Sequence, residues 1–188
     1  MKKIITLVAI IAFAATAFPQ VSIHGGGNVS QLTGAAYPSS IFGGQIGVTT
    51  FSNRLFSIQP GVFLISKGGG DLEGGTTRLN YLQVPVNMML GYNINEDLRF
   101  VLGAGLYCSF GLWGSSPRSG GAIDFFNDND EHRFVDLGWQ IMFGAQMGRY
   151  GARLSFHRGL MSVFSAAPRA NNSVFTFGVS YTFGDMDR

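Results

Sequence analysis

The sequence predicts an all-β fold: one eight-stranded antiparallel up-and-down transmembrane β-barrel with short periplasmic turns and longer extracellular loops. Three observations predict it. Apolar and polar residues alternate with a period of two over long runs, short and long connections between the runs alternate, and only 13% of the 188 residues are charged. Because an average domain has about 25% charged residues, we expect the outer face of the barrel wall to contact lipid.

The N-terminal residues predict a secretory signal peptide. Lys2 and Lys3 precede an apolar run from Ile4 to Ala14, and small residues follow at 15–17. This layout is typical of a cleaved signal, and the run is shorter than the roughly 20 residues that a spanning helix needs. We therefore expect a signal peptide at 1–17, a barrel at 18–183 and a short tail at 184–188.

The charge balance argues against nucleic acid as a partner. The whole chain has 13 Lys and Arg against 11 Asp and Glu, and removal of Lys2 and Lys3 would leave 11 of each. No run of like charge remains that would bind a phosphate backbone. The single cysteine, Cys108, cannot form a disulfide within the chain.

Eight segments of the chain carry the alternation that is typical of strands. In the last of them Phe175, Phe177 and Val179 face one side, while Thr176 and Gly178 face the other. Several segments exceed the five or six residues of an average strand and reach the roughly 9–11 that a tilted membrane strand needs. The predicted strands cover residues 21–31, 42–52, 55–66, 78–93, 98–113, 133–148, 150–163 and 173–183.

The connections predict the orientation of the barrel. Residues 52–54, 93–97 and 148–150 form short connections. The long connections are residues 32–41, the glycine-rich 67–77, 114–132 and 164–172. In outer-membrane barrels the short turns and both termini lie on the periplasmic side, and we expect the same here.

Aromatic residues stand near the predicted strand ends, where rings are stable at the level of the lipid headgroups. Those near the short connections are Tyr92, Phe100, Tyr150, Tyr181 and Phe183. Those near the long connections are Tyr107, Phe110, Trp113 and Phe164. We expect these rings to form the two girdles of the barrel.

The inward positions of the predicted strands carry polar side chains. The main cluster consists of His24, Asn28, Gln59, Gln83, Asp136, Gln140, Arg153 and His157, and Gln45, Asn87 and Gln146 share its face. We expect Asp136 and Arg153 to form an ion pair, since their strands are neighbours. Because buried polar groups normally satisfy one another, the cluster is interpreted as a plug. A polar path or a binding site is the alternative.

No catalytic, metal or cofactor site is predicted. Ser155 and His157 share a face at a spacing that nucleophile activation could use, but no acidic residue stands nearby to orient the histidine. The acidic segment 124–132 could bind a divalent cation through oxygen ligands. Its spacing does not match a calcium loop, so a solvated acidic loop is expected.

Several stretches carry a family resemblance. They are residues 56–61 with a strand ending Lys67-Gly68-Gly69, Leu79-Asn-Tyr81-Leu-Gln-Val-Pro85-Val86, Asp136-Leu-Gly138, and Phe177-Gly178-Val-Ser-Tyr181-Thr-Phe183. Over residues 21–183 the chain resembles the small outer-membrane β-barrel family broadly described as porin-like. The resemblance implies a place in the Gram-negative outer membrane. It also implies that Gly178, Tyr181 and Phe183 form the signal recognised by the barrel-assembly machinery.

The expected function is structural. Eight-stranded barrels are usually filled by side chains, so we expect a monomeric surface-interaction barrel that contacts lipid and lipopolysaccharide and has no enzymatic activity. A narrow channel for small solutes is the first alternative. A lipid A-modifying enzyme and a soluble lipocalin-like binder, whose apolar residues would face inward, are the others.

Overall fold

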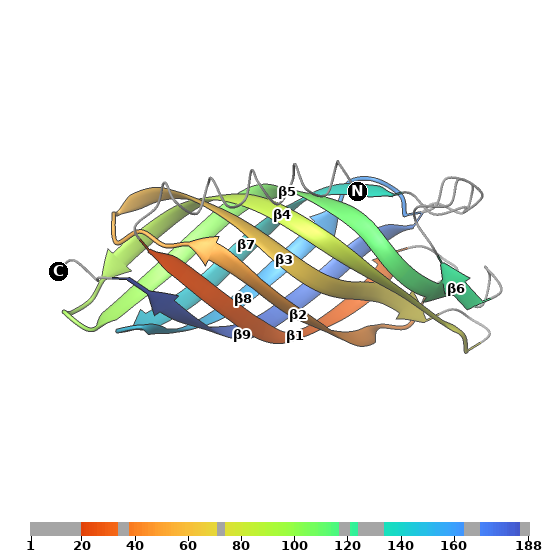
Figure 1. The fold of residues 1–188 in the computed structure, drawn as a ribbon, viewed down its shortest axis with the longest axis horizontal. Helices are drawn as coiled ribbons and strands as arrows, with labels where there is room; N and C mark the ends of the chain where they lie inside the picture. The colour runs from red at the N-terminus through yellow and green to blue at the C-terminus, as the bar shows by residue number, and fades with distance from the viewer. Residues whose placement is uncertain are drawn as a thin grey trace.

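The strands close into one barrel. The computed structural model describes residues 20–33, 38–70, 74–116, 121–123, 134–163 and 170–184. Within these ranges the strands are β1 Val21–Thr33, β2 Ile41–Thr50, β3 Phe56–Gly70, β4 Thr76–Asn93, β5 Leu98–Ser116, β6 Gly121–Ile123, β7 Val135–Met147, β8 Tyr150–Gly159 and β9 Asn171–Phe183. All except β6 form a closed ring, because β4 pairs with β5 and β1 pairs with β9. The predicted eight-stranded antiparallel barrel is confirmed (Figure 1).

Most strand boundaries lie within two residues of those predicted, and three differ by three or four residues. β3 continues to Gly70 and β5 continues to Ser116, into segments predicted as loops. The glycines at 68–70 pair with residues 76–78 of β4, because glycine in an extended strand can still make the ladder hydrogen bonds. The short β6 pairs with the extended end of β5. β8 instead ends at Gly159, short of the predicted residue 163.

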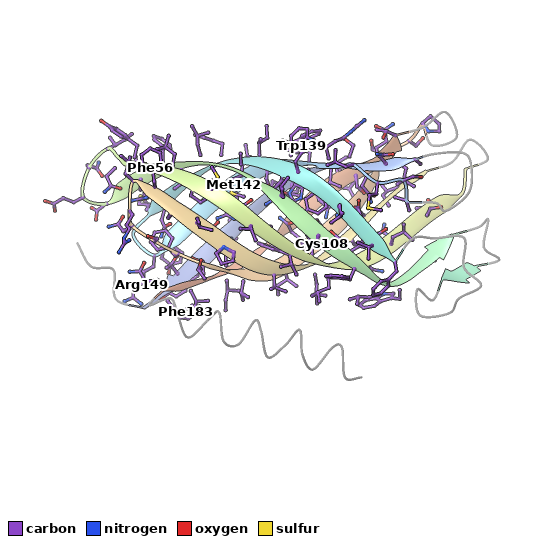
Figure 2. All side chains as sticks on the ribbon, turned by 90° about the horizontal axis from the view of Figure 1, so that it is seen from above. Phe56, Cys108, Trp139, Met142, Arg149 and Phe183 are labelled. Carbon is purple, nitrogen blue, oxygen red and sulfur yellow. The ribbon has the colours of Figure 1, made fainter. Side chains whose placement is uncertain are left out.

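The short connections lie together at one end of the barrel, here called the short-turn end. The Phe51 amide donates to the Gln20 carbonyl at 3.0 Å, and the Gly148 amide donates to the Asp97 carbonyl at 3.0 Å. Gly148 has a φ of 54°, a backbone angle that a tight hairpin turn requires and glycine adopts freely. Figure 2 shows Phe56, Arg149 and Phe183 at this same end. The opposite end is called the long-loop end.

The outer face of the wall is apolar. Phe42 and Met88 are each 73% exposed. Other exposed apolar residues on this face include Ile46, Phe56, Ile58, Leu106, Phe143, Phe175, Phe177 and Val179. Among the residues that the structure describes, no helix is long and apolar enough to cross a membrane.

Several rings of the predicted girdles are exposed, and one predicted ring is not. Tyr92, Tyr150 and Phe183, near the short-turn end, and Trp113, towards the long-loop end, are exposed. Tyr107 is instead buried inside the barrel, with 3% of its surface exposed. It lies at the middle of β5 and in its inward phase, so it is neither near a strand end nor on the lipid-facing side. Phe164 lies outside the described residues.

The closure of the barrel between its first and last strands depends on glycine. Gly26 of β1 stands opposite Gly178 of β9. A Cβ atom added to Gly26 would lie 2.1 Å from the Phe177 carbonyl oxygen, whereas one added to Gly25 would meet nothing within 4 Å. The two neighbouring glycines therefore offer a direct test of how closely β1 and β9 must approach.

We expect Gly26→Ala to lower the free energy of unfolding by about 1–3 kcal/mol, because the added methyl group forces the two strands apart. The matched variant Gly25→Ala should change it by less than about 0.5 kcal/mol. Urea titration of the refolded barrel, followed by the heat-dependent shift in gel mobility, measures both. Equal stability of the two variants would contradict the close approach of β1 and β9.

Candidate functional site in the barrel lumen

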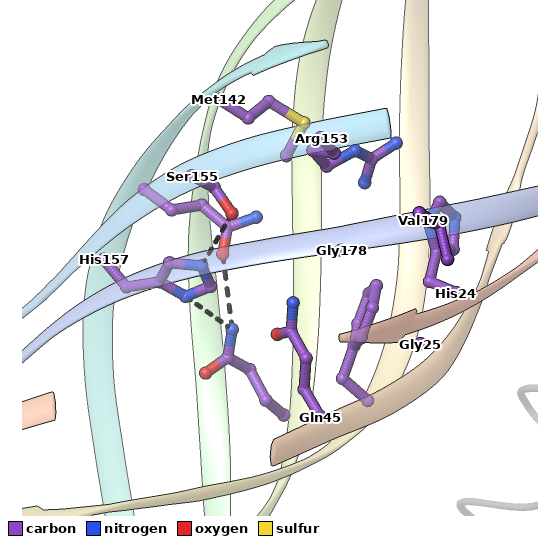
Figure 3. Close-up of a pocket in the computed structure, with 12 residues that line it drawn as sticks. His24, Gly25, Gln45, Met142, Arg153, Ser155, His157, Gly178 and Val179 are labelled. Carbon is purple, nitrogen blue, oxygen red and sulfur yellow. Dashed lines mark hydrogen bonds between the residues drawn. The ribbon is translucent and has the colours of Figure 1, made fainter. Parts of the chain in front are cut away.

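The polar residues predicted to face inward lie inside the barrel. Seven residues of the main cluster are buried: His24, Asn28, Gln59, Gln83, Asp136, Gln140 and His157. Arg153 is partly buried, and it lines an internal cavity with Gln45 (Figure 3). Asn87 is buried with the main cluster. The predicted polar cluster therefore lies in the lumen, and the contacts within it decide what it can do.

A buried ion pair lies toward the long-loop end of this interior. Lys67 Nζ lies 3.5 Å from Asp136 Oδ2, and both side chains are almost completely buried. Asn172 donates to the same carboxylate oxygen at 2.9 Å. The lysine ammonium also lies 5.1 Å from the centre of the Tyr81 ring and 4.6 Å from that of the Tyr107 ring. Aromatic faces attract a cation, so the two tyrosines stabilise the charge that the carboxylate balances.

The predicted pairing of Asp136 with Arg153 is wrong. Arg153 stands opposite Gly144 in the β7–β8 register, eight positions along β7 from Asp136. Its guanidinium instead donates from Nη2 to Gln59 Oε1 at 3.1 Å. Neighbouring strands bring together only residues equally far from their shared turn, and these two residues are not.

Lys67 was missed because its glycine-rich surroundings predicted a loop. The alternation does continue through it: Gln59, Gly61, Phe63, Ile65 and Lys67 all occupy buried positions of β3. Extending the period of two past residue 66 would have placed the lysine inside the barrel. The alternation in the sequence indicates an inward Lys67, whereas the glycine content of residues 67–77 indicates a loop.

A hydrogen-bond network continues from the ion pair into the middle of the lumen. Lys67 donates to Ser109 Oγ at 3.3 Å, and Ser109 donates to Gln83 Oε1 at 3.2 Å. The Gln83 amide then reaches Gln140 Oε1 at 3.3 Å and His157 Nδ1 at 3.1 Å. Gln140 in turn donates to Asn87 Oδ1 at 2.8 Å. Side chains from β3, β4, β5, β7 and β8 are thereby connected across the lumen.

Ser155 and His157 are in contact, but their surroundings differ from those of a catalytic pair. Ser155 Oγ lies 3.1 Å from His157 Nε2 and 2.5 Å from Thr176 Oγ1. The other ring nitrogen of His157 contacts the Gln83 amide rather than a carboxylate. Both side chains are buried, at 7% and 4% exposure. The pair can relay hydrogen bonds within the network, and Ser155 also lines an apolar pocket of about 660 Å³ with Leu154 and Phe156.

Apolar side chains fill the lumen beyond the network, toward the long-loop end. The cluster consists of Leu32, Ile65, Leu79, Tyr81, Val163, Ala170 and Val174. The Val163 amide donates to the Ala170 carbonyl at 2.7 Å and brings residues 163 and 170 together. Tyr81 belongs to this cluster and also contacts the Lys67 ammonium, so the apolar layer covers the ion pair directly.

An arginine, Arg99, links the connections at the short-turn end. Arg99 donates from Nη1 to the Asn53 carbonyl at 2.6 Å, to Asn53 Oδ1 at 2.7 Å and to Asn93 Oδ1 at 3.1 Å, and from Nη2 to the Arg54 carbonyl. A Cβ atom at Gly91 would collide with the Arg99 guanidinium, so the missing side chain of this glycine makes room for it. The arginine connects the β2–β3 connection to β4 and β5.

The predicted assembly signal on the last strand and the predicted acidic loop are the two remaining sites. Gly178, Tyr181 and Phe183 all lie on β9. The Tyr181 ring makes edge contacts with two other rings, with centre-to-centre distances of 4.8 Å to Phe183 and 5.3 Å to Tyr150. The acidic segment 124–132 lies outside the described residues. Among the residues described, no three His, Cys, Asp or Glu side chains lie close enough together to hold a metal ion.

We expect Asp136→Asn to lower the free energy of unfolding by about 3–5 kcal/mol, because it leaves the buried Lys67 ammonium without a countercharge. The double variant Lys67→Met with Asp136→Leu should recover most of that loss, since apolar side chains can replace a buried ion pair. Urea titration in detergent micelles measures both. The exposed Asp97→Asn is the control, and a double variant no more stable than Asp136→Asn would refute the ion pair.

The comparisons with known proteins identify the fold and the family. Neisserial surface protein A has 9% sequence identity to the chain and a TM-score of 0.57, with 87% of this chain and 97% of that one covered. The attachment invasion locus protein Ail of Yersinia pestis, in complex with the heparin analogue sucrose octasulfate, has 13% identity and a TM-score of 0.49, with 88% and 99% covered. No curated protein sequence matches significantly. The family model of the outer membrane protein beta-barrel domain matches residues 4–183, so the chain belongs to this family and is a protein of the outer membrane.

Proposed function

We propose that this barrel is a structural and surface-interaction protein of the outer membrane whose lumen stays closed. The observation that carries the proposal is the filling of the lumen along its length. An apolar cluster, a hydrogen-bonded polar network and the Arg99 clamp follow one another from the long-loop end to the short-turn end. An eight-stranded barrel is just wide enough for side chains to fill or to hold one small ligand, and these groups leave a pocket of about 20 Å³ beside Arg153.

The channel alternative has less support. The cavity in the polar region has a volume of about 20 Å³, which is room for about one water molecule. A conducting path would have to break the Lys67–Asp136 pair or displace the apolar cluster above it. Each of those steps would expose buried charge or apolar surface, so the closed arrangement is favoured.

We expect the purified protein in planar lipid bilayers to give no stable ohmic conductance, because its interior is filled. A large porin purified and inserted in the same way serves as the positive control. Reproducible single-channel steps from the wild-type protein, at a protein density where empty detergent gives none, would overturn the proposal in favour of a channel.

We also propose that the barrel has no enzymatic activity toward lipid A. The serine and histidine that could form a nucleophilic pair face the lumen and are buried. A lipid substrate would approach from the opposite, outer face of β8. The exposed apolar residues of that outer face instead support lipid as the barrel's surrounding partner.

Mass spectrometry of lipid A should therefore give identical spectra from cells that express the wild-type barrel, the Ser155→Ala variant or no barrel. The reason is that both side chains are buried and their contacts lie within the lumen network. A change in acyl composition that depends on wild-type expression and disappears in Ser155→Ala would show that the barrel is an enzyme.

The remaining partners are proposed from the last strand and from the family. The inward Gly178 and the outward Tyr181 and Phe183 on β9 support recognition by the barrel-assembly machinery. We propose that the protein acts as a monomer, since its ring of strands is closed within one chain. Contacts with lipopolysaccharide at the outer leaflet complete the proposal.

A further inference from the structure

Arg153 differs from the other two cations of the lumen in how its charge is balanced. Lys67 has a carboxylate partner in Asp136, and Arg99 is surrounded by carbonyl oxygens. Arg153 makes one side-chain hydrogen bond, to the neutral amide oxygen of Gln59. Among the described residues no carboxylate contacts it. An arginine is charged at any physiological pH, and a cation in a low-dielectric interior needs an anion or several strong acceptors.

The guanidinium lines a pocket of the lumen with a volume of about 20 Å³. Besides Arg153, the lining includes His24, Gln45, Gln83, Gln140, Ser155 and His157, and no lining residue carries a carboxylate. The cavity is large enough for one particle of about the size of water, and it is too small for a tetrahedral oxyanion. Its one permanent charge is positive.

Several hydrogen-bond donors around this cavity are not used elsewhere. Apart from its bond to Gln59, no further contact of the Arg153 guanidinium is found within the described residues. His24 Nε2 lies 2.8 Å from Thr49 Oγ1, and Nδ1 carries a free N–H in the tautomer in which Nε2 accepts from that hydroxyl. In the view of Figure 3, Arg153 and Gln45 lie on opposite sides of the pocket, and the Gln45 amide points into it. A neutral water molecule could satisfy such donors, but it would leave the arginine charge unbalanced.

We propose that this cavity is a binding site for one small monovalent anion of halide size, with chloride as the physiological candidate. Arg153 supplies the charge, and Gln45 and His24 supply further donors. This inference concerns an internal ion and does not depend on the surface-interaction role proposed above.

The first test locates the ion. Crystals of the wild-type protein folded and grown in sodium bromide should give an anomalous difference peak within hydrogen-bonding distance of the Arg153 guanidinium. This measurement needs no variant, so it stays decisive even if substitutions at residue 153 prevent folding. Density for water alone at this place, without an anomalous signal, would overturn the proposal.

The second test measures binding in solution. The barrel is folded into detergent at fixed ionic strength in chloride, gluconate or sulfate, and the temperature of unfolding is recorded. Chloride should raise it saturably relative to gluconate, because a ligand that binds only the folded state stabilises it. Sulfate does not fit the cavity and should give only the gradual rise of an excluded salt.

Two substitutions assign the chloride effect to the cavity. Arg153→Met should abolish the saturable rise, and Gln45→Leu should shift its midpoint to several-fold higher chloride. Arg158→Met is the matched control, since Arg158 lies on the same strand in the opposite, outward phase, and it should respond as the wild type does. The same chloride response in Arg153→Met and wild type would refute the site.

Discussion

The structure depends on one constraint: within a lipid bilayer every backbone amide and carbonyl must find its partner inside the protein. The strands meet this constraint by closing on themselves, with β1 paired to β9 and β4 to β5. Closure with eight strands fixes a narrow lumen. The side chains that alternate inward then have to occupy that lumen, and the buried polar ones have to satisfy each other.

This constraint explains which parts of the structure the sequence could predict. The alternation of apolar and polar residues is local, so it assigns Gln83, Gln140 and His157 to the lumen without any knowledge of the fold. Their contacts with one another are different, because β4, β7 and β8 are joined across the lumen rather than through turns. The tilt and stagger of the strands set how far along the barrel axis each residue lies. No local pattern in the sequence encodes that tilt or stagger.

The two errors in the predicted lumen have separate physical causes. Asp136 and Arg153 lie on neighbouring strands, and the tight turn at 148–149 already fixes their register and keeps them apart. For Lys67, a glycine-rich segment indicated a loop, whereas the pairing of 68–70 with β4 shows that glycine can also extend a strand into a crowded wall. A high glycine content shows only that side chains are absent. Tight turns and closely approaching strands both need such positions, so glycine content alone does not distinguish them.

Charge inside the lumen is the property that composition conceals most completely. The acidic and basic residues of the chain nearly balance, yet the described lumen holds Lys67, Arg99 and Arg153 against Asp136 alone. Backbone carbonyls at the short-turn end stabilise one of these cations, and the carboxylate with its two tyrosine rings stabilises another. The third lies beside a cavity with unused donors. Since the cost of a buried charge grows as its partners are removed, the same closure that excludes solvent makes an internal anion the simplest way to balance Arg153.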